Sequence, residues 1–426
     1  MLKQKQRKKR IKLKKHLSIK PYIYFIVMKV YCKLDGFYHI YDGVETKKVF
    51  EEPKGDTLLN DSFYDENKTL DECLKAYYDQ MKIWTEEIVN GLKIKSLNKC
   101  FDSESKLLYT LFKIYRKDKH IEYDPVSYDE NCWFDNCNKT GLIYADVGEY
   151  KNVNAYDFQK FYSNILGHYN SQKKFPIKAG QEIHIKEFPE NKKDLQYGIY
   201  RVKIISKDEN ITRIFGFSKA DHYTHEDIQY AFFLKSKGYI DSIDLINDGC
   251  YNALVYNEFV DSKTIFKTYV GVMNNLAIDY PKNKLIKALL SSLWGRLWVK
   301  NTVKKMTQEE FMELDEEEQE DFMMVKWYYE YDKIYSKRTR VIEFVKSKSI
   351  YKYNIRLQPF LGSFARKKMG NQILKYYDDI IRVQVDGVIF KNTKETLNLQ
   401  KGLYIIDKKY NDKNIFIKNL KKVIIR

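Results

Sequence analysis

The most constraining feature of the sequence is a short run of apolar, largely β-branched residues that Asp-Gly interrupts. Residues 380–390 read Ile-Ile-Arg-Val-Gln-Val-Asp-Gly-Val-Ile-Phe. Asp-Gly in such surroundings is the strongest local signal for a tight β-hairpin. The pattern therefore predicts two antiparallel strands with Asp386 near the tip. Its carboxylate either shapes the turn or projects into a cleft that the sheet lines.

Helical and strand-like patterns follow one another along the chain without the strict alternation of a parallel βαβ fold. Thr224 with Asp227, and Thr307 with Glu310, form capping-box patterns that mark helix starts. We therefore predict an α+β fold. Helices are expected within 68–118 and at 222–237, 284–299, 307–322 (an acidic surface helix) and 358–376, and strands at 21–45, 142–147, 153–158, 197–206 and on both sides of Asp386-Gly387.

The positive charge of the chain is concentrated at its beginning. The formal net charge is +17, and residues 1–20 hold ten Lys or Arg and no acid, which leaves 17 − 10 = +7 on the rest. We expect residues 1–20 to form a disordered basic tail. The remaining charge permits phosphate binding without requiring it. Met28 is an alternative start that would remove this tail.

The apolar stretch from Pro21 to Cys32 is too short to span a bilayer and predicts a buried strand instead. We expect no membrane association. The chain shows no signal peptide, which predicts reduced thiols and a cytoplasmic rather than a secreted protein. Cys132 and Cys137 form a lone C-x4-C with no second pair, a pattern that favours two half-buried thiols over a zinc site.

An acid ends a second apolar run. The run from Val153 reaches Asp157, and Tyr162 follows five residues later at the expected start of a helix. An acid at a strand-to-helix turn is well placed to hold a divalent metal, although a helix-capping Asp would give the same pattern. Together with Asp386, it could bind two Mg²⁺ ions, which lie about 3.5–4 Å apart in such sites.

The expected helix from Lys284 carries two distinct stripes. On a 3.6-residue period, one stripe offers cations, a hydroxyl and bare backbone, and the other faces the core. The first stripe suits a triphosphate with a base beyond it, whereas an ordinary amphipathic helix with lysines at its edge is the alternative. The first stripe comprises Lys284, Lys287, Ser291 and Gly295, and the second Leu285, Leu289 and Leu293.

In this order, the three segments resemble motifs of the family B DNA polymerases, written D-x-x-S-L-Y-P, K-x-x-x-N-S-x-Y-G and Y-x-D-T-D-S. Residues 157–163 keep the Asp and the Tyr. Residues 287–295 keep the Lys, the second Ser and the Gly. Residues 383–387 keep only the second Asp, Asp386, because Gln384 replaces the first acid. Residues 358–366 and 138–144 are similar to further family segments, and residues 223–228 are most like protein-primed, mobile-element or large-virus members.

The resemblance covers roughly residues 135–425 and implies a polymerase palm with an antiparallel sheet, short helical fingers, a minimal thumb and a small N-terminal α/β region. It also implies replication in the cytoplasm or at a viral or mobile-element replication site. The implied segments are a tail (1–20), an N-terminal region (21–134), a first palm segment (135–210), fingers (211–299), a second palm segment with an acidic helical insertion (300–395) and a palm end with a minimal thumb (396–426).

Roles follow from the resemblance residue by residue. Asp157 and Asp386, with the Phe158 carbonyl, would hold two Mg²⁺ ions, with Mn²⁺ as an alternative. Tyr162 would lie under the deoxyribose and exclude a 2′-hydroxyl. The implied partners are primer-template DNA, deoxynucleoside triphosphates and a terminal protein or other replication factor. Nucleotide contacts would further come from Lys282, Lys284, Lys287, Ser291, Trp294 and Gly295, and DNA contacts from Gly141, Tyr144, Arg366, Lys418, Lys421 and Lys422.

A proofreading exonuclease is not expected, because the acids at 60–65 and 102–104 come in the wrong order for its carboxylate cluster. Two other functions remain open. A decayed polymerase could bind nucleic acid or a replication partner without synthesis, which Gln384 and the minimal thumb would favour. A nuclease or another two-metal phosphotransferase would also need metals and phosphates, but it leaves the helix from Lys287 to Gly295 unexplained.

Overall fold

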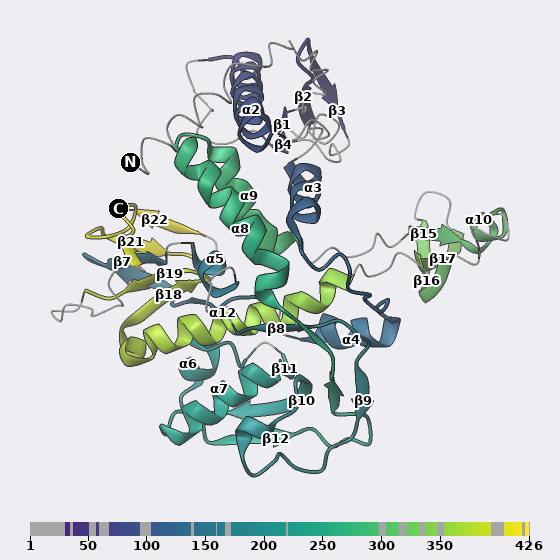
Figure 1. Cartoon of the computed structure of the whole chain (residues 1–426), viewed down its shortest axis with the longest axis vertical. Helices are drawn as coiled ribbons and strands as arrows, with labels where there is room; N and C mark the ends of the chain where they lie inside the picture. Colours follow the sequence, from purple (N-terminus) through teal and green to yellow (C-terminus); the bar gives the residue numbers. More distant parts are fainter. Residues whose placement is uncertain are drawn as a thin grey trace, which may run out of the picture. The chain divides into compact units, whose positions relative to one another are not determined.

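In the computed structural model of the protein, the chain folds into two compact units (Figure 1). Unit 1 comprises Met1–Leu111 with Leu276–Ile286, and unit 2 comprises Phe112–Asn275 with Lys287–Arg426. The expected tail, Met28 and Lys421 lie outside the described residues. The structure describes residues 30–34, 37–50, 57–58, 68–93, 104–137, 140–158, 160–166, 172–218, 220–297, 304–314, 319, 322–332, 337–346, 353–392, 404–419 and 422–425.

Unit 1 combines a four-stranded sheet, in the order β3-β2-β1-β4, with a long amphipathic helix. Helix α2 (Leu70–Leu92) begins at a capping box between Thr69 and Glu72 and ends at Lys93, whose φ is 55°. Its buried face includes Leu74, Tyr77 and Met81, the helical spacing seen in the sequence. The strands are β1 (Val30–Leu34), β2 (Phe37–Tyr41), β3 (Thr46–Val49) and β4 (Thr57–Leu58).

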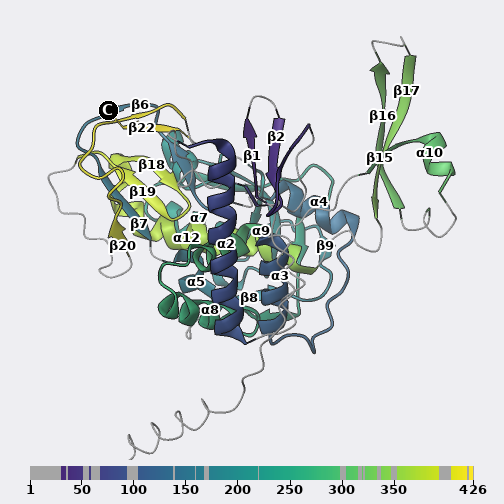
Figure 2. The ribbon, with the colours of Figure 1, turned by 90° about the horizontal axis from the view of Figure 1, so that it is seen from above.

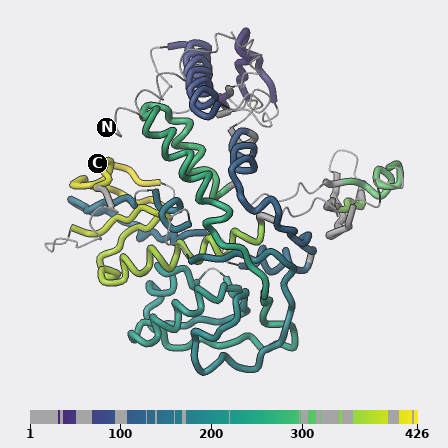
Figure 3. The backbone as a smooth tube through the Cα atoms, in the orientation of Figure 1, coloured from purple at the N-terminus to yellow at the C-terminus, as the bar shows by residue number. Residues whose placement is uncertain are grey.

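The chain crosses between the units inside three helices, and the backbone can be followed through them in Figure 3. Helix α3 (Glu104–Tyr115) leads into unit 2. Helix α8 (Ser262–Asp279) leads back to unit 1, and α9 (Lys284–Arg296) returns to unit 2. None of the helices in the described ranges is long and apolar enough to cross a membrane.

The central sheet of unit 2 is antiparallel, in the order β20-β7-β19-β18-β5. Side chains alternate between its faces, as period 2 requires. Phe158 and Val388 face a large core shared with α12 (Leu357–Ile373), whereas Ala155 and Ile389 face a smaller core shared with the sheet β22-β21-β6. The bounds are β5 (Ile143–Ala145), β6 (Gly148–Tyr150), β7 (Asn154–Phe158), β18 (Ile380–Gln384), β19 (Gly387–Phe390), β20 (Tyr404–Ile406), β21 (Ile415–Ile417) and β22 (Val423–Ile425).

A second antiparallel sheet, in the order β11-β10-β13-β9 with β12 also on β10, carries α7 (His225–Ser236). The capping box of Thr224 and Asp227 is present as predicted, but residues 222–224 form strand β11 rather than the first turn of the helix. The other elements here are α4 (Tyr128–Asn136), α5 (Phe161–Leu166), β8 (Lys174–Pro176), β9 (Gln181–Ile183), η3 (Lys192–Asp194), β10 (Gly198–Ile205), α6 (Glu209–Ile214), β12 (Ser242–Leu245), β13 (Ala253–Val255) and β14 (Phe259–Asp261).

Between α9 and α12, a three-stranded ribbon, β15-β17-β16, packs with the short helix α10 (Gln308–Met312) (Figure 2). The capping box of Thr307 and Glu310 is present, and α10 ends at Met312; residues 315–318, 320 and 321 of the predicted helix 307–322 lie outside the described ranges. Phe322 already belongs to β16, which is rich in aromatic residues and pairs along β17 from Phe322 opposite Lys346 to Asp332 opposite Lys337. The remaining bounds are β15 (Lys304–Thr307), β16 (Phe322–Asp332), β17 (Lys337–Lys346), η4 (Tyr353–Arg356) and η5 (Leu374–Asp379). The predicted mixture of helices and antiparallel sheets is confirmed.

Candidate active site

Two acids meet where strands of the central sheet end. Asp157 is the fourth residue of β7 and pairs in register with Gly387 of β19. The backbone N–H of Phe158 donates a 2.8 Å hydrogen bond to the carbonyl oxygen of Asp386. Asp386 therefore lies in a hairpin turn, as the sequence predicts, and β19 after that turn pairs with the strand that carries Asp157.

The turn that carries Asp386 is shifted by one residue from the Asp-Gly turn that the sequence suggests. Gln384 pairs with Gly387, so the loop consists of Val385 and Asp386, and Gly387 is already the first strand residue. The N–H of Asp386 donates to the Gln384 carbonyl at 2.7 Å, an i→i+2 bond across Val385. Val385 has a φ of +58°, which strains a β-branched residue. Such strain clusters at functional sites, where the surrounding structure maintains it.

The two acids are electrostatically coupled. Burial raises the pKa of Asp386 to about 6, and the Asp157 carboxylate adds to this effect. Burial also raises the pKa of Asp157, with a contribution from Asp407. The site thus gathers negative charge in a partly desolvated place, which a cation would stabilise.

Asp407 is a third acid that the sequence analysis did not identify. It follows β20, in which Ile405 pairs with Asp157, and its N–H donates to the Ala155 carbonyl at 2.9 Å. A cavity of about 580 Å³ is lined by Asp157, Asp407 and their neighbours. The signal was available, because Tyr404-Ile405-Ile406 is another apolar run that ends in an acid.

Carboxylate oxygens are the ligands that Mg²⁺ prefers, so the raised pKa of Asp386 beside Asp157 fits a divalent ion. Within the described ranges, however, no group of three or more His, Cys, Asp or Glu side chains is close enough to form a ready-made metal cluster. The site therefore offers a pair of acids with Asp407 nearby, and any further ligands would come from backbone, solvent or substrate.

Gln384, which stands where the resembled motif has its first acid, is held by an arginine. Arg382 donates a hydrogen bond from its guanidinium to the Gln384 side-chain oxygen. Burial lowers the pKa of Arg382, and the nearby Asp407 and Tyr410 oppose that shift. An Arg-Gln pair thus occupies the position where the resembled motif has its first acid.

Helix α9 presents the predicted stripes. Lys287, Ser291 and Gly295 are exposed, whereas Leu289 and Leu293 are fully buried. The positive charge of Lys287 lowers the pKa of Asp157 against the effect of burial, so the ammonium group lies within electrostatic reach of the acid pair. A side chain at Gly295 would meet nothing within 4 Å, which leaves open space beside the stripe. Lys282 and Lys284 are also exposed and belong to unit 1.

Tyr162 lies close to the acids and is braced by Trp294. It belongs to α5, which follows a turn where Lys160 has a φ of 48°. The rings of Tyr162 and Trp294 lie 5.5 Å apart, tilted by 31°, and Trp294 is 4% exposed. Burial raises the pKa of Tyr162 to about 12, and the Asp386 carboxylate adds to the shift. This arrangement places an aromatic wall beside the acid pair.

The residues predicted to contact DNA are placed less favourably. Arg366 is 2% exposed and bonds both oxygens of Asp227, at 2.8 and 2.6 Å, so the expected direct contact with DNA is not available to it. Tyr144 is buried in the core, with Arg213 over its ring. Gly141 lies against Val385, whose Cγ1 would be 3.0 Å from an added Cβ. Of this set, Lys418 and Lys422 are exposed, and Lys421 lies outside the described residues.

Comparisons with known proteins identify a fold rather than a family. No family model and no curated protein matches the sequence. Solved structures of phi29 DNA polymerase are similar to the chain. The complex with single-stranded DNA has a TM-score of 0.50 and 13% identity, covering 91% of this chain and 70% of that one. The orthorhombic crystal form has a TM-score of 0.48 and 12% identity, covering 81% of this chain and 57% of that one. The primer-template complex has a TM-score of 0.48 and 12% identity, covering 87% of this chain and 60% of that one.

The chain thus spans about 57% to 60% of the length of the orthorhombic and primer-template structures. At 13% identity, the similarity to the complex with single-stranded DNA bears on the fold alone. The chain has a fold that resembles a polymerase domain.

Proposed function

We propose that the chain is a template-dependent DNA polymerase that adds deoxynucleotides to a primer 3′-hydroxyl without proofreading. The observation that carries the proposal is the arrangement of Asp157 and Asp386 on paired strands with Lys287 in electrostatic reach. A nuclease would need the acids but not a cationic helix with open space beyond it. The polymerase-like fold supports the same choice.

Asp157 and Asp386, with the Phe158 carbonyl, would hold Mg²⁺ or Mn²⁺, which supplies charge stabilisation for the attacking and leaving oxygens. The primer hydroxyl would lose its proton to solvent and attack the α-phosphorus of the incoming nucleotide; the new P–O bond forms as the bond from the α-phosphorus to the α,β-bridging oxygen breaks and pyrophosphate leaves. Lys287 would neutralise the triphosphate from the exposed stripe of α9, with Ser291 and Gly295 leaving room beside it. Primer-template DNA and deoxynucleoside triphosphates are the partners, and a terminal protein is a further candidate.

Tyr162 would lie beneath the sugar of the bound nucleotide. Its contact with the buried Trp294 limits how far the ring can move. The central sheet with α12 would then act as the palm, α8 and α9 as the fingers, and the chain after β19 as a minimal thumb.

One observation favours a second function, a polymerase relative that binds nucleic acid without synthesis. Arg382 bonded to Gln384 places a cation beside the position where the resembled motif has its first acid, which weakens the case for two metals. Primer extension separates the two functions. We expect extension by the wild type with Mg²⁺ or Mn²⁺, and loss of at least a hundredfold in Asp386→Asn.

The matched control is Asp241→Asn, which changes an exposed acid elsewhere in unit 2 and should extend like the wild type. DNA binding without extension under both ions would support the non-synthetic function instead. Equal activity of wild type and Asp386→Asn would contradict the assignment of the acid pair.

A further inference from the structure

Val385, directly before Asp386 in the hairpin turn, has a backbone conformation that its surroundings must maintain. Its φ of +58° lies in the left-handed region, which a β-branched residue rarely adopts. If Val385 relaxed to an ordinary conformation, the next peptide would turn and would carry the Asp386 side chain with it. The position of this acid therefore depends on whatever holds Val385 in place.

Residues 140–142 run beside the turn and supply this support. The N–H of Val385 donates a 2.8 Å hydrogen bond to the carbonyl oxygen of Leu142, whose side chain is fully buried. Gly141 lies against the same residue, since a Cβ added to it would lie 3.0 Å from Cγ1 and 3.2 Å from Cα of Val385. Two backbones therefore meet at a distance that the missing side chain of Gly141 permits.

The conformation of Gly141 does not itself require glycine. Its φ lies outside the left-handed region, so alanine could adopt the same backbone. The three nearest neighbours of an added Cβ all belong to Val385, and one of them is a backbone atom, which cannot swing aside as a side chain can. Any effect of a methyl group at position 141 would therefore reach the turn through Val385.

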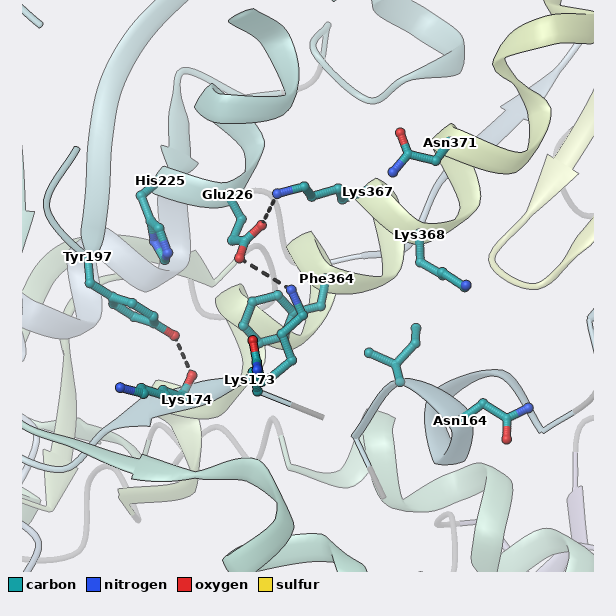
Figure 4. Close-up of a pocket in the computed structure, with 12 residues that line it drawn as sticks. Asn164, Lys173, Lys174, Tyr197, His225, Glu226, Phe364, Lys367, Lys368 and Asn371 are labelled. Atoms are coloured by element: carbon teal, nitrogen blue, oxygen red, sulfur yellow. Dashed lines mark hydrogen bonds and ion pairs between the residues drawn. The ribbon is translucent and has the colours of Figure 1, made fainter. Parts of the chain in front are cut away.

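The buried Arg366 of α12 fixes the same segment from its other end. Its Nη1 donates a 2.5 Å hydrogen bond to the Thr140 carbonyl oxygen, while Nε and Nη2 donate to Asp227 of α7. A neighbouring ion pair, between Lys367 of α12 and Glu226 of α7, has a distance of 2.5 Å (Figure 4). Two adjacent ion pairs thus join these helices, and Arg366 connects the joint to the segment beside the turn.

We propose that Gly141 positions Asp386 for its metal ion by holding Val385 in the left-handed conformation. Arg366 supports Gly141 through its bond to the Thr140 carbonyl. This role rests on the proposed function, in which Asp386 is a metal ligand. Gly141 is a positioning residue, because it acts on the ligand through the turn and touches neither metal nor substrate.

The test compares Mn²⁺ binding to the full chain in the wild type and in Gly141→Ala, by electron paramagnetic resonance of the free ion. The added methyl group should displace Val385 and with it Asp386, and weaken Mn²⁺ binding roughly tenfold, as loss of an outer support of a metal ligand does. The matched control is Gly148→Ala, whose added Cβ would lie 3.2 Å from the Tyr150 hydroxyl oxygen. This control makes a similarly close contact elsewhere and should bind Mn²⁺ like the wild type.

A double-mutant cycle shows whether the effect passes through Val385. Val385→Gly removes Cγ1 and Cβ, and glycine adopts the left-handed conformation readily, so this variant should bind Mn²⁺ nearly as tightly as the wild type. Adding Gly141→Ala to it should then have little further effect. A purely structural glycine would instead lower the Tm in both backgrounds and leave the Mn²⁺ affinity of the folded protein unchanged. Asp386→Asn gives the level of Mn²⁺ binding outside the acid pair.

Four outcomes overturn the proposal: no Mn²⁺ binding by the wild type beyond that of Asp386→Asn, unchanged binding in Gly141→Ala, equal weakening in the Gly148→Ala control, or the same effect of Gly141→Ala in both backgrounds. A glycine that contacts DNA would weaken DNA-binding anisotropy instead of Mn²⁺ affinity.

Primer extension separates this test from that of the proposed function. If the wild type binds Mn²⁺ but extends no primer, the polymerase assignment fails, whereas the Mn²⁺ affinities of the four proteins in the cycle still decide the role of Gly141.

Discussion

Asp157 pairs in register with Gly387, and a Cβ placed on Gly387 would lie 3.9 Å from a carboxylate oxygen of Asp157. The glycine therefore borders the acid pair directly, next to Asp386 in sequence. A side chain at position 387 would enter the space beside the Asp157 carboxylate. Because glycine has none, β19 leaves that carboxylate accessible to a ligand.

The raised pKa of Asp386 predicts a pH-dependent stability. Its folded-state pKa is about 6, above the unfolded value of about 3.9, so folding favours the protonated acid. This contribution is complete below about pH 4 and is lost as the pH rises through 6. Urea unfolding without divalent ions should show Asp386→Asn more stable than the wild type at pH 7.5, by roughly 2 kcal/mol.

The same variant should lose stabilisation by metal. Millimolar Mg²⁺ should raise the Tm of the wild type, because an ion bound by the folded state alone stabilises it by mass action. Asp386→Asn should show little of this rise, and Asp241→Asn should behave like the wild type. An equal rise of Tm in all three proteins would place metal binding elsewhere.

Lys287→Ala is expected to raise the KM for deoxynucleotides by at least tenfold while primer-template affinity changes little. The ammonium group lies within reach of Asp157 and on the exposed stripe of α9, where it would meet the triphosphate rather than the duplex. Steady-state extension kinetics and DNA-binding anisotropy measure the two effects. The control is Lys263→Ala, an exposed lysine on α8. Loss of both functions in parallel would mean that the helix is structural.

Asp407→Asn should raise the Mg²⁺ concentration required for half-maximal extension several-fold. The negative charge of Asp407 raises the pKa of Asp157, and both residues line the same cavity. Removing the charge of Asp407 should therefore lower the negative potential that attracts the ion. Titration of extension rate with Mg²⁺, with Asp241→Asn as control, measures the shift. An unchanged Mg²⁺ requirement would restrict Asp407 to a structural role beside Arg382.

Arg366→Gln should destabilise the fold by roughly 3–5 kcal/mol, because it leaves the buried Asp227 carboxylate at the cap of α7 without its cation. Urea unfolding measures the loss. A DNA-contacting arginine would instead weaken DNA binding with stability unchanged, and that result would restore the sequence-based prediction for this residue.

The positions that sequence predicted well depend on local pattern. Asp157 and Asp386 each end an apolar run, and period 2 fixes which face such residues take. The stripe of Lys287, Ser291 and Gly295 follows from the 3.6-residue period alone. In each case, the information lies within about a dozen neighbouring residues.

The positions that sequence missed depend on distant pairing. The sequence identifies Arg366 as a cation, but it does not reveal that its partner is Asp227, which is 139 residues away. Asp407 approaches Asp157 only because β20 pairs with β7, a register that no short pattern specifies. The end of the expected helix 307–322 was wrong at Phe322, which pairs with Lys346 of β17, and no short pattern specifies that partner.

Tyr162 supports the last prediction, which concerns sugar choice. Its ring lies beside the buried Trp294 and in the field of Asp386, so a nucleotide whose phosphates approach the acids would bring its sugar to this wall. A phenol ring there would leave no space for a 2′-hydroxyl. Tyr162→Val should therefore raise ribonucleotide incorporation relative to deoxynucleotide incorporation at least tenfold, measured by single-nucleotide extension. A merely structural tyrosine would cost stability, up to roughly 3–5 kcal/mol for a large aromatic truncation, without changing sugar preference. Tyr162→Phe is the control, because it keeps the ring and should still exclude ribonucleotides. A folded, active Tyr162→Val enzyme that still rejects ribonucleotides would show that this wall does not select the sugar.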